Sequence, residues 1–254
     1  MDLEADSAPG PVYRHDPIVE AIVELVFEPG PEWNITIPGR LYDGLRDTYP
    51  DPPKQREILE AGLSSEDDEK VGNAFTVSRK GTRVVFGNDN KLLMVGPDVL
   101  SVHSLRPYEG WQRLLPRIVG ALDSYVAIAR PSGVRKLSLR YINRINIPED
   151  SFSLTEYFTI TQGLPDAFPS RMTAFIDRME LAYEDIPAKI IFTWATTQPS
   201  SPGQSSFLLD LDLHWNEKCS VDEAVQHLVD LRQRERDAFE SVINNRLREM
   251  FNAD

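Results

Sequence analysis

The chain has 254 residues and a formal net charge of −13, and so acidic a surface disfavours non-specific binding to nucleic acid. Its single cysteine, Cys219, excludes an internal disulfide and a cysteine-rich zinc site. The N-terminal residues do not resemble a signal peptide, and no apolar run reaches the ~20 residues that span a membrane, so we expect a cytoplasmic protein without membrane contact.

The first half of the chain reads as a strand, a short helix, several strands and a long helix. Residues 1–17 are polar and rich in Pro, Gly and Asp, which predicts a flexible tail. In 18-IVEAIVELVFEP-29 small and apolar residues alternate with glutamates, which predicts a strand. We then predict a helix over 38–48, strands near 55–62, 73–79, 82–87 and 91–95, and hairpin turns at 79–83 and 87–90. A helix follows over 108–128, where Pro116 should kink or split it.

The second half repeats this order. We predict a strand over 137–147, a short helix over 153–162, strands near 172–183, 188–196 and 205–215, and a long helix over 221–251. Ser220 and Glu223 have the spacing of a capping box at the start of that last helix.

This order predicts an α+β fold of two pseudo-repeated halves, 18–130 and 134–254. Each half would hold a short helix, a curved antiparallel sheet and a long helix. Together they would form one continuous sheet with helices on one face, a duplicated helix-grip arrangement. The topology resembles the TATA-box-binding-protein fold, and such a resemblance transfers no function.

The middle strand, 137-LSLRYINRINIP-148, carries Arg140 and Arg144 on its polar side. If the first strands of the two halves lie side by side, Glu20 and Glu24 share that face, and the four charges would clamp the halves together. The functional alternative is an anion-binding site formed by Arg140, Arg144 and the intervening Asn143.

A second candidate lies in 207-FLLDLDLHW-215, where Asp210, Asp212 and His214 share one face of a strand. Two carboxylates and an imidazole can bind a metal or transfer protons. One straight strand rarely directs three ligands at one ion, so we expect a solvated or salt-bridged face, with Arg140 or Arg144 as partner. We therefore predict no metal site.

No motif indicates catalysis or a cofactor. The chain lacks GxGxxG, GxxxxGK[ST], GxSxG and HExxH. Cys219 precedes a helix N-terminus, where the pKa of a thiol can fall, but no histidine pattern accompanies it. The mixed-charge run 232-RQRERD-237 is typical of an exposed helix face. We predict no cofactor and no catalytic residue.

Three segments also carry a family resemblance: HDPIVEAIVELVFEP, LRYINRINIP and RERDAFESVINNRLREMF. They resemble an uncharacterised, sporadically distributed bacterial family of about this length. The resemblance implies no activity, although a patchy distribution suggests defence-associated genes.

These observations favour a non-enzymatic interaction or regulatory protein, such as an immunity factor, an antitoxin or a defence-system subunit. Its partner would be a protein encoded nearby. The alternative is a sensor or enzyme for a small anionic, nucleotide-like ligand on the polar sheet face. The sequence leaves the oligomeric state open.

Overall fold

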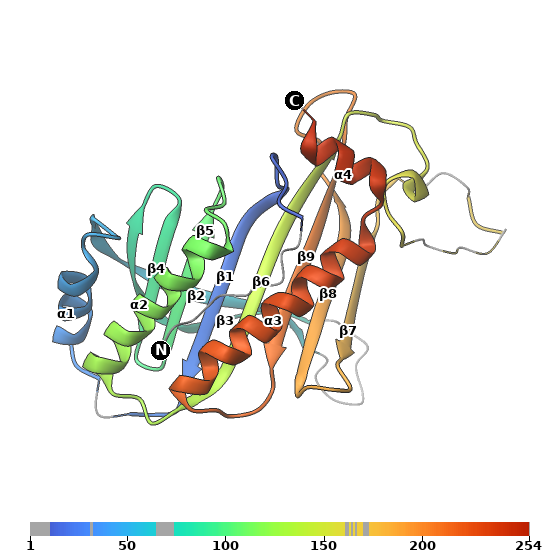
Figure 1. Cartoon of the computed structure of the whole chain (residues 1–254). Helices are drawn as coiled ribbons and strands as arrows, with labels where there is room; N and C mark the ends of the chain where they lie inside the picture. The colour runs from blue at the N-terminus through green and yellow to red at the C-terminus, as the bar shows by residue number, and fades with distance from the viewer. Residues whose placement is uncertain are drawn as a thin grey trace.

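The computed structural model describes residues 11–30, 33–64, 74–160, 163, 165, 167–169 and 173–253. Within these residues the chain is a mixed α+β protein with a single antiparallel sheet of nine strands, in the order β2-β3-β4-β5-β1-β6-β9-β8-β7, and four α-helices. The long helices α2 and α3 lie on the same side of the sheet (Figure 1).

The elements have the following bounds. The strands are β1 Ile18–Phe27, β2 Asp51–Ser64, β3 Ala74–Asn88, β4 Lys91–Gly96, β5 Val99–Leu105, β6 Val134–Ile147, β7 Ile176–Ala182, β8 Ala188–Thr197 and β9 Ser205–Trp215. The α-helices are α1 Thr36–Leu45, α2 Trp111–Ala129, α3 Val221–Val242 and α4 Asn245–Asn252, and Leu154–Glu156 forms a short 3₁₀ turn.

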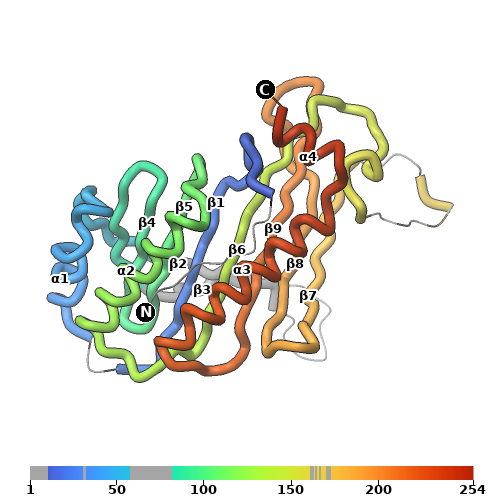
Figure 2. Tube along the Cα trace, in the orientation of Figure 1, coloured from blue at the N-terminus to red at the C-terminus, as the bar shows by residue number. Residues whose placement is uncertain are grey.

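The centre of the sheet joins a strand from near the start of the sequence to one from its middle. Figure 2 shows β1 and β6 running side by side, and their antiparallel register pairs Ile22 with Arg140 and Val23 with Leu139. Because side chains alternate along a strand, Val23 and Leu139 point toward the helices and are fully buried. The even-numbered side chains of β6 from Ser138 to Arg144, and their neighbours on β1, therefore lie on the opposite, polar face.

The structure differs from the predicted elements at four places before the last helix. The expected hairpin turn at 79–83 lies inside β3, where Ile58 pairs with Gly81 and Leu59 with Arg79, so one extra residue forms a bulge. The strand β5 was not predicted and fills the position between β4 and β1. The helix predicted over 153–162 is only the 3₁₀ turn, and residues 161 and 162 lie outside the described part. Pro116 neither splits α2 nor ends it.

The predicted final helix is broken in two at Ile243. The capping box of Ser220 and Glu223 starts α3 as expected. Ile243, however, has extended backbone angles and is buried, and it forms a β-bridge with Phe158. The Asn244 side chain then accepts a hydrogen bond from the backbone N–H of Arg246 and so caps α4. Tertiary packing of one apolar side chain outweighs the continuous helical pattern here.

Candidate functional site

The polar face of the sheet holds most of the residues singled out in the sequence. Arg140 and Arg144 lie on it, as do Glu20 and Glu24 of β1. The neighbouring strand β9 adds Asp210, which pairs with Ile142. Asp212 and His214 follow it on the same face of β9. These side chains gather on one surface because each comes from an even position of an alternating strand.

The predicted arginine–glutamate clamp is wrong, because Arg140 binds Asp210 instead. Its Nε donates to Oδ1 at 2.8 Å and its Nη2 to Oδ2 at 2.5 Å, a two-pronged ion pair. The Asp210 residue is only 7% exposed, so the guanidinium supplies the charge that this buried carboxylate needs. The same hydrogen bonds, despite an opposing effect of burial, raise the pKa of Arg140. The expectation that the aspartate row would be salt-bridged with Arg140 agrees with this geometry.

The other residues of the proposed anion site do not converge with Arg140. Arg144 donates from Nη2 to the Gln198 carbonyl at 2.5 Å, which ties β6 to the loop before β9. Asn143 lies on the helix side, 1% exposed, and its amide donates to the Leu209 carbonyl at 3.2 Å. Asn143 is therefore a structural residue of the core, and the three-residue anion site is not formed.

Glu20 and Glu24 have partners in the first half of the chain. Glu24 accepts a hydrogen bond from Nη1 of Arg83, on β3, at 2.7 Å. Glu20 lies 2.8 Å from Nδ1 of His103, whose Nε2 lies 2.8 Å from the Ser101 hydroxyl. This row places a hydroxyl, an imidazole and a carboxylate in the order of a hydrolase triad. Ser101 is 1% exposed, however, so the row is an internal hydrogen-bond network that is buried at the serine.

The remaining acid–base candidates are also dispersed. His214 Nε2 lies 3.1 Å from Oδ1 of Asp212, a contact separate from the Arg140–Asp210 ion pair. No group of three or more His, Cys, Asp or Glu side chains capable of holding a metal occurs among the described residues. Burial, with a smaller contribution from Glu223, raises the pKa of the Cys219 thiol, which is the opposite of activation.

The run 232–237 differs from the exposed helix face expected for it. Arg232 lies over the ring of the buried Tyr141, 4.5 Å from its centroid, and is ion-paired with Glu235. Glu235 is 3% exposed. Burial, and secondarily Arg232, lowers the pKa of Arg236, whose Nε is buried without a hydrogen-bond partner. Sequence reasoning missed this inward charge because Arg232, Glu235 and Arg236 interrupt the apolar stripe of α3.

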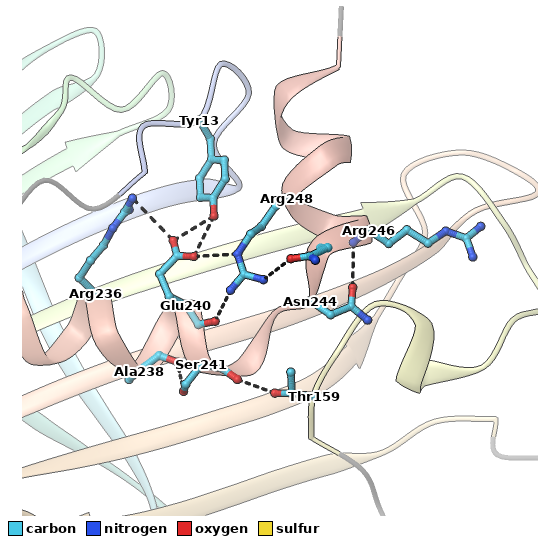
Figure 3. Close-up of polar contacts among 10 residues, drawn as sticks. Tyr13, Thr159, Arg236, Ala238, Glu240, Ser241, Asn244, Arg246 and Arg248 are labelled. Atoms are coloured by element: carbon cyan, nitrogen blue, oxygen red, sulfur yellow. Dashed lines mark hydrogen bonds and ion pairs between the residues drawn. The ribbon is translucent and has the colours of Figure 1, made fainter.

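A second polar cluster joins the N-terminal segment to the junction of α3 and α4 (Figure 3). Tyr13 points at Glu240, and its hydroxyl donates to the carboxylate at 2.9 and 3.0 Å. Arg248 of α4 donates to the same carboxylate at 3.1 Å. Tyr13 is also buried against Phe251, so at this point the expected tail is packed on the core, while residues 1–10 lie outside the described part.

The outer strand β7 is the last strand of the described sheet, and six of its seven residues are exposed. Ile176 is 76%, Leu181 52% and Met179 43% exposed. Met179 pairs with Phe192 and Leu181 with Ile190, so both point to the helix side. An exposed edge strand with large apolar side chains is a template for pairing with another chain. The sequence predicted the strand and gave no signal of its position at the edge.

The comparisons with known proteins add no relative. A scan against models of protein families finds no match to this chain, and a search of curated proteins finds no similar sequence. The resemblance to an uncharacterised bacterial family therefore stays a prediction. Within the described residues, no helix is long and apolar enough to cross a membrane.

Proposed function

We propose that this chain is a non-enzymatic protein-interaction protein that docks partners by adding a strand to its β7 edge. The exposure of Ile176, Met179 and Leu181 on that edge carries the proposal. Strand addition uses main-chain hydrogen bonds for affinity and alternate side chains for specificity. The catalytic candidates support it indirectly, since Ser101, Arg140 and Asp210 are engaged in internal contacts.

The backbone of β7 offers every second residue to a partner. Tyr183 N–H donates to the Ala188 carbonyl, and Thr196 N–H donates to the Phe175 carbonyl. Odd-numbered residues of this strand therefore direct their backbone groups at β8. The backbone groups of even-numbered residues, such as Arg178 and Glu180, point away from the sheet.

We propose further that the partner is encoded near this gene, in the manner of immunity factors, antitoxins and defence-complex subunits. The acidic charge and the resemblance of the three sequence segments support this. We also propose that the two halves are repeated units. The strand order supports this second proposal, because β5 and β9 flank the central β1 and β6, and β2 and β7 end the sheet.

Co-expression with the neighbouring genes followed by size-exclusion chromatography tests the proposed function. Arg178→Pro removes an outward N–H and Leu181→Lys replaces an exposed apolar side chain, and both should remove the associated protein while the fold is kept. Ile35→Lys is the matched control, because Ile35 is an exposed apolar residue remote in sequence from β7. If all associations persist in both β7 variants, the proposed function is wrong.

A second candidate function, the binding of a small anion, is favoured by Arg236. Its Nε is buried without a hydrogen-bond partner, and Glu240, 3.6 Å from its Nη2, also accepts hydrogen bonds from Tyr13 and Arg248, so this guanidinium shares its carboxylate partner. A phosphate or carboxylate ligand would compensate it. Phosphate should then raise the melting temperature of the wild-type chain and not that of Arg236→Leu. Equal shifts in both proteins would reject this site.

A further inference from the structure

The exposed β7 strand has a charge pattern that is complementary to itself. The strand reads IDRMELA, with Arg178 and Glu180 on either side of Met179. All three side chains are exposed. Two copies of such a strand can pair antiparallel about a twofold axis, and a twofold interface brings each residue against its symmetry counterpart.

We infer that the occupant of the β7 edge is the β7 strand of a second copy, paired antiparallel with Met179 opposite Met179. This inference rests on the proposed function and names the partner for its docking edge. It joins the two sheets of the dimer into one continuous sheet.

In this register Arg178 of each copy lies opposite Glu180 of the other, so the dimer has two such pairs of opposite charge. Residue numbers across the pair add up to 358, so Arg178 lies opposite Glu180 of the second copy, and Glu180 opposite its Arg178. Opposite charges placed directly across an antiparallel pair stabilise it. Glu180 is also ion-paired with Lys189 of its own chain, so in the dimer its carboxylate lies between two cations.

The backbone hydrogen bonds fit the same register. Arg178 and Glu180 both direct their N–H and C=O groups outward, so they form a hydrogen-bonded pair across the dyad. Ile176 and Ala182 form the next such pair. Met179 meets its counterpart in a non-hydrogen-bonded pair, where side chains lie closest. The exposed Ile176 and Met179 each gain an apolar neighbour.

Neighbouring dyad positions do not match the charges. An axis at Arg178 places arginine opposite arginine, and an axis at Glu180 places glutamate opposite glutamate. An axis at 177 sets Arg178 against Ile176, and one at 181 sets Glu180 against Ala182. Among these axes only the one at Met179 pairs Arg178 with Glu180, and it sets the third charge of the strand, the half-buried Asp177, opposite Leu181. The two exposed charges of β7 therefore select one register. The strand has seven residues, so we expect a dimer of micromolar rather than nanomolar affinity.

Charge exchange tests this register directly. In Arg178→Glu two glutamates face each other twice, and in Glu180→Arg two arginines do so. Each variant alone should dimerise about tenfold more weakly or worse in sedimentation-velocity runs. An equimolar mixture of the two should recover wild-type association, because both cross-strand pairs are then opposite in charge. The double variant should recover it as well.

A disulfide provides an independent readout. In a Cys219→Ser background, Met179→Cys places two thiols at a pair whose Cα atoms lie about 4.5 Å apart, within disulfide range. It should cross-link on mild oxidation. Leu181→Cys is the control, since its two copies lie four residues apart along the pair, about 13 Å, and should not cross-link.

Three outcomes separate this inference from the proposed function. Recovery in the mixture together with cross-linking at 179 supports both. A wild-type chain that stays monomeric at several hundred micromolar, a concentration far above a micromolar Kd, but binds a neighbour-encoded protein through β7, overturns self-pairing and keeps the proposed function. A dimer that is unaffected by charge reversal and by Arg178→Pro, together with no loss of any neighbour-encoded protein from the β7 variants, overturns both.

Discussion

The pairing of Arg140 with Asp210 makes a sharp prediction about stability. Arg140→Ala leaves the Asp210 carboxylate in a site where it is only 7% exposed and loses both of its short hydrogen bonds. Breaking a fully buried ion pair costs about 3–5 kcal/mol. The Arg140 side chain is 40% exposed, so water screens the pair and we expect a smaller loss of about 2 kcal/mol.

Urea unfolding followed by tryptophan fluorescence measures this loss. Arg144→Ala is the matched control, because Arg144 donates chiefly to the Gln198 carbonyl and its removal should cost about 1 kcal/mol or less. Replacing both partners, with Arg140→Met and Asp210→Leu, should recover most of the stability, since no buried charge remains unpaired. If Arg140→Ala and Arg144→Ala unfold at the same urea concentration as the wild type, Arg140 does not have the structural role assigned to it.

Two further predictions concern the C-terminal helices. Asn244→Ala removes the cap of α4 and should lower the free energy of unfolding by about 1 kcal/mol, whereas Asn244→Asp should keep it; calorimetry distinguishes the two. Burial and Glu240 raise the pKa of Tyr13 to about 12, above its ordinary value near 10. The stability from Tyr13 should therefore be complete below pH 10 and disappear as the pH rises toward 12. The difference between wild type and Tyr13→Phe in urea unfolding should shrink over that range, and a constant difference would contradict it.

The positions of most elements could be predicted because alternation and helical spacing are local properties. In β1 and β6 the buried residues recur at every second position, and both strands follow the predicted pattern closely. The strand β5 was missed although Ser101 and His103 alternate with apolar residues there, because the buried Ser104 puts a polar residue at a helix-side position and breaks the alternation. Buried polar residues weaken the contrast on which a sequence pattern depends.

The ion pairs could not be predicted because they depend on register. Arg140 has a glutamate-bearing strand on one side and an aspartate-bearing strand on the other, and both place carboxylates on its face. Only the register shows that Asp212 lies directly opposite Arg140 and that Asp210 lies diagonally across from Arg140, within reach of its side chain. His103 reaches Glu20 in the same way, from a strand that the sequence did not indicate.

The sheet is too wide for its helices to cover, and this leaves the helix side of β7 exposed. Adjacent strands lie about 4.8 Å apart and a helix is about 10 Å wide, so the two long helices cover only about half of a sheet of this size. On the outer side of the first half, α1 extends the cover, with Tyr42 packed near Phe86 of β3. The corresponding helix predicted over 153–162 is only a 3₁₀ turn in the described residues. The helix side of β7 therefore keeps Met179 and Leu181 in solvent, and this uncovered edge is the one from which we derive the interaction.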